Sequence, residues 1–257
     1  MADGHEIECG CVISDAGAAN TFGRLLPAEV SRQHGYDGLL SQVKPSVGHL
    51  GVYIGLRGTA AELGLPKTNY WIYPGNDSDA ALDRYLADPS SEFPVVYLSF
   101  PSAKDPDFER RHPGKATIEI VAPVPYEPFA AWAGKTWGRR GEDYEALKKA
   151  YGERLLAQLF DKVPQARRHI DYWEVSTPLS MQWFCGWQRG ELYGLEHDPA
   201  RMRARWLRPR TKVPGLWIKG QDIMSCGVSG AMMGGLACAT AVAGVRHMMP
   251  VMKRIFG

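Results

Sequence analysis

Short runs of alternating apolar and polar residues occupy the first half of the chain. The runs HLGVYIGLRG (49–58), NYWIYP (69–74), VVYLSF (95–100) and ATIEIVAPV (116–124) are rich in aromatic and β-branched residues and are bounded by Gly, Pro, Asn or Asp. Both features are typical of β-strands. The connections between the runs are too varied for a regular alternation of strands and helices, so the pattern predicts a mixed or antiparallel sheet that carries helices.

Helical periodicity appears in two segments between and after these runs. A short helix is expected at 79–87. A longer one is expected at 144–160, where Leu147, Tyr151, Leu155 and Leu159 share one side of a helix.

A third helix is predicted to begin after Thr177, because a threonine followed by proline is a common helix start, and to end at about Gly186. Its bulky side chains lie nearly all around the axis, and they are Leu179, Met181, Trp183, Phe184 and Trp187. This distribution predicts burial on both sides, either in an ordinary core or against the pocket of an apolar substrate. The following RGELYG (189–194) is expected to form a turn or loop.

The beginning of the chain combines a turn signal with a strand pattern. Asp3-Gly4 is typical of a two-residue hairpin turn, and HEIECGCVIS (5–14) is expected to be the strand that returns from it. The strand entering the turn would then lie before Met1.

The next segment, SDAGAANTFGRLL (14–26), predicts a short helix. Asp15 or Asn20 can cap it, and Phe22, Leu25 and Leu26 are expected on one side.

The end of the chain has a glycine-rich helix start. The apolar run LWI (216–218) is followed by a tight turn at 220–222 and a helix-like stretch that contains Gly227, Gly230, Gly234 and Gly235. Glycine in a helix interior costs about 0.5–1 kcal/mol relative to alanine, so something should lie close to this backbone. Such a turn presents backbone N–H groups to a phosphate or an electron-rich heterocycle, and Asp222 can accept hydrogen bonds from hydroxyls.

Two other interpretations of this segment stay open. Residues 226–245 carry no charge and have the small-residue spacing of membrane helix pairs. Alternatively, the helix packs tightly inside the protein without a ligand. No GxGxxG followed by an acidic residue about 20 positions on occurs in the chain, so it carries no dinucleotide fingerprint of the usual kind.

Composition narrows the classes of function. The 30 Lys and Arg residues against 28 Asp and Glu give a formal net charge of +2, so there is no general attraction to nucleic acid. The 5 cysteines lack a CxxC pair, which favours packed thiols in a reducing compartment over disulfides or a metal site. No basic segment followed by an apolar core opens the sequence. We expect no nucleic-acid partner, no metal, and a cytoplasmic or peripheral membrane location.

The segment LWIKGQDIMSCGVSGAMMGGLACATAVAG (216–244) resembles the flavin motif of the phytoene desaturase, carotenoid isomerase and retinol saturase family of FAD-dependent oxidoreductases. Three further segments agree in order, and they are CVISDAGAANTFGRLLP (11–27), GVYIGLRGTAAELGLPKTNYWIYP (51–74) and STPLSMQWFCGWQRGELYGLEHDPARM (176–202). The resemblance is nearest to the retinol saturase branch. It covers essentially the whole chain, but only the carboxy-terminal half of a family member.

The resemblance implies an α/β fold of the mixed α+β kind, the carboxy-terminal half of a two-domain, amine-oxidase-like oxidoreductase without a complete Rossmann unit. Residues 1–28 would be the returning part of the FAD-binding domain, 29–205 the substrate-binding domain with an apolar channel, and 206–257 the carboxy-terminal part of the FAD-binding domain. The missing amino-terminal half, which grips the ADP part of FAD, would come from the same gene or a separate chain.

The resemblance also implies positions for the cofactor contacts. Gly220 and Asp222 would lie near the ribityl and pyrophosphate region of FAD. Ser14 and Ala16 would lie where the returning strand passes the cofactor, whereas Asp15 stands where family members often have Asn. The residues expected to cover the ribityl chain and the pyrimidine edge of the flavin are Gly227, Val228, Gly230 and Ala231.

The implied chemistry is transfer of a hydride, or of paired electrons and protons, between FAD and a carbon–carbon bond of a carotenoid- or retinoid-like polyene. The result would be saturation, desaturation or isomerisation. Tyr193, Glu191 and His197 are candidates for a proton donor, and the sequence selects none of them. This chain alone is expected to be inactive. The competing hypothesis is a non-enzymatic membrane-associated or subunit-interaction module built on the glycine-rich helix.

Overall fold

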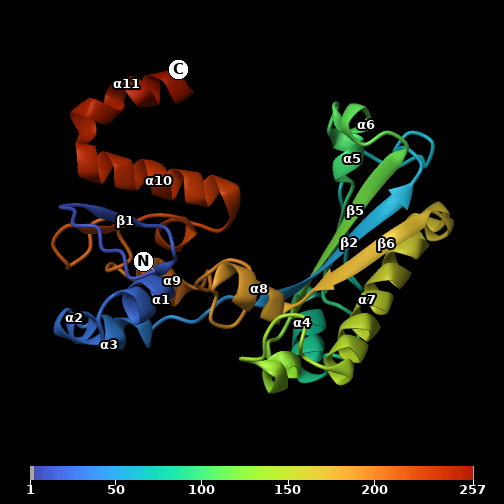
Figure 1. Cartoon of the computed structure of the whole chain (residues 1–257), viewed down its shortest axis with the longest axis horizontal. Coiled ribbons are helices and arrows are strands. Elements are labelled where there is room, and N and C mark those ends of the chain that lie inside the picture. The colour runs from blue at the N-terminus through green and yellow to red at the C-terminus, as the bar shows by residue number, and fades with distance from the viewer. Residues whose placement is uncertain (1–2, 257) are drawn as a thin grey trace. The chain divides into compact units, whose positions relative to one another are not determined.

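A computed structural model describes residues 3–256, and the chain divides into two compact units (Figure 1). The segment Val47–Glu191 forms one, called here the inserted unit. The residues up to Ser46 and from Leu192 onward form the other, called the terminal unit. The boundaries predicted at 28 and 205 both lie inside the terminal unit, because Tyr36 and Leu195 belong to its buried core.

The inserted unit is built on a five-stranded antiparallel sheet in the order β3-β4-β5-β2-β6. Its strands are β2 (Gly48–Arg57), β3 (Tyr70–Ile72), β4 (Val96–Ser99), β5 (Lys115–Val124) and β6 (Ile170–Ser176). The four predicted runs are confirmed as β2 to β5. The sequence pattern does not predict β6, because Val175 is its one fully buried residue and the strand shows little alternation.

Helices α4 and α7 pack on the face of this sheet that carries Leu50 and Val52. The helices of the unit are α4 (Ser78–Ala87), α5 (Pro101–Lys104), α6 (Phe108–Arg111), α7 (Glu142–Lys162) and α8 (Pro178–Cys185), with 3₁₀ turns at Glu127–Trp132 and Pro164–Arg168. Figure 1 shows α7 running beside β6. Gly152 permits this close approach, since a Cβ there would overlap the Trp173 ring.

The three helices predicted in this unit are confirmed as α4, α7 and α8. The amide of Thr177 donates to Ser180 Oγ at 3.2 Å, as expected for a capped start of α8. The burial predicted on both sides of α8 is wrong. Leu179 is fully buried, but Trp183 and Phe184 are 50% and 65% exposed, because only one side of this helix meets the sheet and its neighbours.

The terminal unit contains a two-stranded parallel sheet of β1 (Val12–Ser14) and β7 (Leu216–Ile218). Its helices are α1 (Ala18–Asn20), α2 (Ala28–Gln33), α3 (Tyr36–Leu40), α9 (Pro199–Arg203), α10 (Gly227–Ala243) and α11 (Val245–Phe256), with a π-helical turn at Thr21–Leu25 and a 3₁₀ turn at Gln221–Ile223. Phe22 and Tyr36 stack with ring centroids 3.8 Å apart, and Trp206 packs edge-on against both rings. These aromatic contacts form a small core.

Several predictions for the first helix and strand are wrong. Of the expected strand at 5–14, only β1 is in a strand. Neither Asp15 nor Asn20 caps α1, whose N-cap is Gly17. Leu25 is 65% exposed rather than buried beside Phe22, because a π-helical turn shifts side chains out of the ordinary helical phase. The turn at Asp3-Gly4 is described, but Met1 and Ala2 lie outside the described residues.

The cysteines do not form the packed set that the sequence suggested. All five are free thiols, and of these only Cys238 is buried. The fold class is nevertheless confirmed as mixed α/β with a mostly antiparallel sheet.

Candidate functional site

The two strands of the terminal unit end side by side. They run parallel with Ser14 opposite Ile218, so both following loops leave the same edge. The Lys219 amide donates to the Ser14 carbonyl at 2.9 Å, and a Cβ added to Gly220 would lie 2.5 Å from a carboxylate oxygen of Asp15. Ligands of parallel α/β sheets commonly bind outside the carboxyl ends of the strands. This edge is therefore the candidate cofactor site of the unit.

Ser14 and Ala16 lie within this edge. The Ala16 amide donates to Ser14 Oγ at 3.4 Å, and Ser14 Oγ lies 2.6 Å from the Thr21 hydroxyl. The neighbouring Asp15 carboxylate forms an ion pair with Lys219 Nζ at 2.5 Å. A carboxylate beside a phosphate would be unfavourable, and this lysine compensates its charge.

Asp222 joins segments that are distant in the sequence. It is 4% exposed, and its two oxygens accept hydrogen bonds from the Ala18 amide at 2.7 Å and the Leu195 amide at 3.0 Å. A Cβ at Gly194 would overlap the same carboxylate. Asp222 therefore holds the start of α1 and the loop at Leu195, and its predicted contact with FAD stays a prediction beside this structural role.

The first turn of α10 is open. Gly227 donates its amide to Gln221 Oε1 at 3.3 Å, and Cys226 provides no side-chain cap. A Cβ at Gly227 would meet no atom within 4 Å, and Val228 is 87% exposed. The positive end of the helix dipole is thus accessible to a ligand.

Two glycines of α10 are explained by the chain itself. A Cβ at Gly230 would overlap the Ser225 carbonyl, and one at Gly234 would overlap the Gly220 carbonyl. The close backbone approach that the sequence indicated is here an internal contact, as in the alternative of a tightly packed helix. Ala231, the remaining predicted contact, is half-buried.

Arg201 stabilises the turn that precedes α10. It is 4% exposed, and its guanidinium donates to the carbonyls of Gln221 at 2.6 Å and Met224 at 3.2 Å. Burial lowers the pKa of Arg201, while the nearby Asp222 carboxylate acts in the opposite direction. Sequence reasoning missed this residue, because only the folded chain brings the two carbonyls to it.

The three candidate proton donors are divided between the two units. Glu191 is 3% exposed, belongs to the inserted unit and accepts a hydrogen bond from the Arg189 amide at 3.0 Å. Tyr193 and His197 belong to the terminal unit. Burial and the charge of Arg201 lower the pKa of His197, whose Nε2 has no hydrogen-bond partner among residues 3–256. Within the described part of the terminal unit, no hydrogen bond joins the side chains of Tyr193 and His197.

The face of the inserted sheet opposite α4 and α7 carries a row of aromatic side chains. The register pairs Trp71 with Tyr97, Tyr97 with Val121, and Val121 with Gly51. The Trp71 and Tyr97 ring centroids are 4.7 Å apart. Tyr53 extends back along β2, since its Oη would lie 2.9 Å from a Cβ at Gly51. Trp71, Tyr97, Val121 and Tyr53 are called here the aromatic row.

The signal for this face was present in the sequence of β2. Leu50, Val52 and Ile54 belong to the core, so the alternate positions His49, Gly51 and Tyr53 face the other way. Sequence reasoning identified the strand but did not single out this alternate set. His49 is 6% exposed, its Nδ1 has no hydrogen-bond partner in the described part of the chain, and burial lowers its pKa.

Carboxylates flank one side of the aromatic row. Glu119 and Glu174 lie directly opposite Tyr53 on the neighbouring strands. Burial raises the pKa of Tyr53, and the charge of Glu119 adds to this shift. This side of the row therefore disfavours anions.

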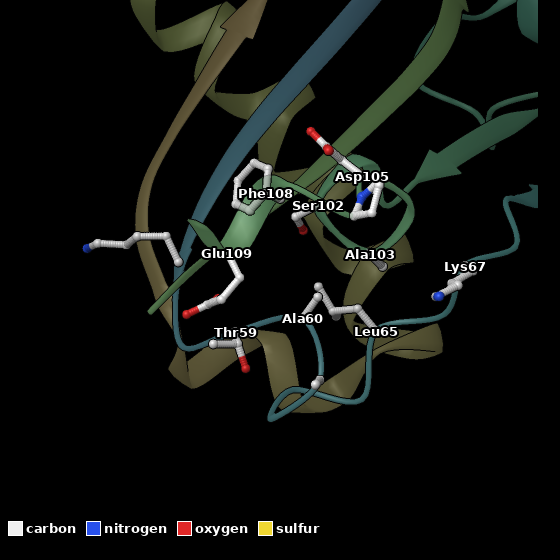
Figure 2. Close-up of a pocket in the computed structure, with 12 residues that line it drawn as sticks. Thr59, Ala60, Leu65, Lys67, Ser102, Ala103, Asp105, Phe108 and Glu109 are labelled. Carbon is white, nitrogen blue, oxygen red and sulfur yellow. The ribbon is translucent and has the colours of Figure 1, made fainter. Parts of the chain in front are cut away.

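A separate pocket of about 430 Å³ lies near the start of β5, at Lys115 (Figure 2). Figure 2 shows Ser102, Asp105 and Phe108 across from Thr59 and Leu65. Ser102 Oγ accepts a hydrogen bond from the Thr117 amide, and Asp105 pairs with Arg111. Ser102 and Asp105 thus have partners within the protein, and we assign no ligand to this pocket.

The outer edge of β1 is unpaired among the described strands. The Val12 amide donates to Gly215 and the Ser14 carbonyl accepts from Lys219, so the N–H and C=O of Ile13 point away from β7. Val12 and Ile13 are each 47% exposed. Beside this strand lies a hollow of about 380 Å³, lined mainly by apolar groups of β1, β7 and the first helical segment. A parallel sheet is ordinarily larger and covered on both faces.

Neither a metal cluster nor a membrane span is evident in residues 3–256. No three His, Cys, Asp or Glu side chains gather there in a way that could hold a metal ion. No helix there is both long and apolar enough to cross a bilayer.

Comparison with known proteins gives this chain its relatives, although no family model matches it. It is 37% identical over 249 residues to human all-trans-retinol 13,14-reductase, covering 93% of this chain and 41% of that protein. It is 33% identical to a zebrafish protein named inactive all-trans-retinol 13,14-reductase, over 92% of this chain and 40% of the relative. It is 27% identical to the neurosporene-forming phytoene desaturase of Rhodobacter capsulatus, over 86% of this chain and 40% of the relative.

The chain thus spans about two fifths of the length of these relatives and matches their carboxy-terminal part. The resemblance seen in the sequence is confirmed. The chain belongs to the family of all-trans-retinol 13,14-reductases and phytoene desaturases.

Proposed function

We propose that this chain is the carboxy-terminal part of an FAD-dependent oxidoreductase that acts on carbon–carbon double bonds of a carotenoid- or retinoid-like polyene. The observation that carries the proposal is the edge where β1 and β7 end, with the accessible start of α10 beside it, in a chain related to retinol reductases and phytoene desaturases. The reaction would be saturation, desaturation or isomerisation.

The residues at this edge fit an FAD molecule in part. Gly227 leaves open space where a side chain would stand, and Val228 is almost fully exposed, so both can cover the cofactor. Ser14, Ala16 and Gly220 lie at the strand ends where its phosphate and ribityl groups would pass. We assign Asp222 and Gly230 a supporting role, because the chain's own main chain already contacts them.

When bound, FAD supplies hydride and electron transfer to or from the polyene. The chain's own residues would provide a binding surface for each molecule. Arg201 and Asp222 hold the loops on which the cofactor rests, and the aromatic row offers an apolar surface to the polyene.

An amino-terminal half, from the same gene or a separate chain, is proposed to complete the site. β1 has an unpaired outer edge, Val12 and Ile13 are exposed, and a hollow lies beside them. These features are expected of a sheet edge that pairs with a further strand. The relatives have about three fifths of their length beyond the matched part, which is enough to supply it.

A chimera tests the proposal. This chain replaces the matched carboxy-terminal part of human all-trans-retinol 13,14-reductase, and the purified product is examined for bound FAD and for conversion of all-trans-retinol. We expect flavin absorbance at one FAD per chain. A folded chimera that carries no flavin, while the parent protein does, would refute the proposal.

A second candidate, a membrane-associated module, is favoured by α11. Val245, Met248, Met249 and Met252 share one face of this helix, and Arg246, His247, Lys253 and Arg254 share the other. This pattern is typical of helices that lie in a membrane interface, and it also suits peripheral attachment of the enzyme. Sedimentation with anionic vesicles tests it. Lys253→Glu combined with Arg254→Glu should reduce binding strongly, and flavin content should not change.

A further inference from the structure

The most unusual polar group of the inserted unit is His49. The residue is 6% exposed, and its Nδ1 has no hydrogen-bond partner in the described residues. A buried polar atom left without a partner costs about 1–3 kcal/mol. Such a group in a native protein calls for an explanation, and a ligand atom is one.

The position of His49 relates it to the aromatic row. It lies on the same face of β2 as Tyr53, opposite Pro123 on β5, and Gly51 lies between the two side chains. The phenol ring of Tyr53 lies over Gly51 and thus points along the strand toward His49. No hydrogen bond of the Tyr53 hydroxyl is seen in the described residues. The end of the row therefore carries two polar groups without a partner among the described residues, the buried imidazole of His49 and the hydroxyl of Tyr53, a residue that is 46% exposed.

The charges around these two groups limit what can bind. Glu119 and Glu174 flank Tyr53, so a ligand carboxylate would be repelled. Burial lowers the pKa of His49, which keeps the imidazole neutral and removes any compensating positive charge. A neutral imidazole has one donor and one acceptor nitrogen, and a phenol hydroxyl can donate and accept. The hydroxyl of an alcohol can therefore form a hydrogen bond with each group, as donor or as acceptor.

We propose that His49 and Tyr53 bind the hydroxyl of a polyene alcohol whose apolar chain lies along the aromatic row. This inference rests on the proposed function and adds the residues that set its specificity. A hydrocarbon polyene would leave both groups unpaired, and a polyene acid would meet the two glutamates. His49 is thus a specificity-determining residue that discriminates an alcohol from both.

Equilibrium binding to the full chain tests this inference. Dissociation constants are measured by fluorescence quenching for all-trans-retinol, for the hydrocarbon in which hydrogen replaces its hydroxyl, and for all-trans-retinoic acid. For the unmodified chain we expect the alcohol to bind about 10-fold tighter than either, equivalent to about 1.4 kcal/mol. In His49→Phe this preference for the alcohol over the hydrocarbon should disappear.

Three further variants make the result specific. His49→Gln keeps a donor and an acceptor and should restore most of the preference. Tyr53→Phe should reduce it in part. His112→Phe, an exposed histidine of the same unit, should leave it unchanged, and circular dichroism verifies that every variant is folded.

Each outcome bears on a definite claim. A folded His49→Phe that still prefers the alcohol 10-fold overturns the inference, as does an unmodified chain that binds all three ligands equally or prefers the acid. An unmodified chain that binds no polyene also overturns this inference, whereas the polyene substrate of the proposed function is judged by conversion of all-trans-retinol in the chimera. Flavin content of the chimera is independent of these measurements, so the proposal of an FAD-dependent enzyme is judged separately.

Discussion

The inserted unit and the terminal unit are stabilised by different kinds of contact. In the inserted unit, an antiparallel sheet and two helices enclose a continuous apolar core in which Leu50, Ile118 and Leu155 are fully buried. The terminal unit has a smaller core around Phe22 and Tyr36, and two strands of three residues each. Much of its order comes from main-chain contacts at glycine and from buried charged side chains.

This difference is related to what each unit can bind. A sheet fixed by a large core holds an open face flat and rigid, as a specific surface for an apolar ligand requires. The terminal unit instead brings loop backbone, a strand edge and a helix start to its surface. Such groups suit a cofactor and a further part of the same fold, and they leave less apolar area to stabilise the unit alone.

The largest expected effect is loss of core packing in the inserted unit. Leu155→Ala removes a fully buried side chain of α7 and should lower the free energy of unfolding by about 2–5 kcal/mol. Urea denaturation followed by circular dichroism measures it. Leu86→Ala, at a position that is 52% exposed, is the control and should cost far less. Equal losses for the two variants would contradict the core assignment.

The next largest effect on stability is expected from substitutions at two adjacent glycines of α10. Gly234→Ala places a methyl group on the Gly220 carbonyl and should destabilise the terminal unit by about 1–3 kcal/mol. Gly235→Ala points into open space and should stabilise the helix by about 0.5–1 kcal/mol. Thermal unfolding of the two variants distinguishes these signs. If both changes stabilise the chain, the close contact of Gly234 does not exist.

A smaller effect is expected at Asp222. Asp222→Asn keeps the shape of the side chain but turns an amide donor toward one of the two backbone amides, so it should cost about 1–2 kcal/mol. Hydrogen exchange at Ala18 and Leu195 should increase in this variant. Unchanged exchange at both amides would refute the bridging role. Asp83→Asn, at an exposed position in the inserted unit, is the control.

The smallest effect concerns pH and compares a histidine from each unit. Burial lowers the folded-state pKa of His49 below its ordinary 6.5. As the pH falls, this histidine is therefore protonated in the unfolded chain before it is protonated in the folded chain. The free energy of unfolding is therefore unaffected by this histidine above its pKa in the unfolded chain. It decreases as the pH falls below about 6.5, by at most about 1.4 kcal/mol per pH unit. His49→Gln should reduce this dependence in urea titrations.

His197 should show the same sign with a smaller size. Burial and Arg201 lower its pKa, whereas the backbone hydrogen bond at Leu195 and the charge of Asp222 raise it, and the side chain is less enclosed. His197→Gln should therefore change the pH dependence less than His49→Gln does. The reverse order would indicate that the terminal unit encloses its histidine more than the structure describes.

Elements with strong local signals could be predicted from the sequence. The strands β2 to β5 and the helices α4, α7 and α8 have periodic apolar positions or clear caps, which depend only on neighbouring residues. The same local rules failed where a longer-range contact decides. The first amide of α1, that of Ala18, donates to the carboxylate of Asp222, which lies 204 positions away, and the N-cap Gly17 has no side chain that could accept this hydrogen bond.

The candidate site shows the same division. Glycine spacing in 220–235 located the helix start and the close approach of backbone, and the resemblance to the family supplied its meaning. That Gly230 and Gly234 meet the chain's own carbonyls, and that Gly227 meets nothing, depends on how the turn at 221–223 folds back against α10. The roles of Arg201 and His49 likewise could not be predicted from the sequence, because they depend on the groups that surround each side chain in the folded chain.

By itself, the sequence determined the family, the class of fold and most of the regular elements, because motifs and periodicity are properties of short segments. Only the tertiary structure decided which glycines are free for a ligand, which carboxylate is already bound, and which face of the sheet is open. Those properties depend on burial and on unpaired polar atoms, and both are set by contacts between residues that are far apart along the chain.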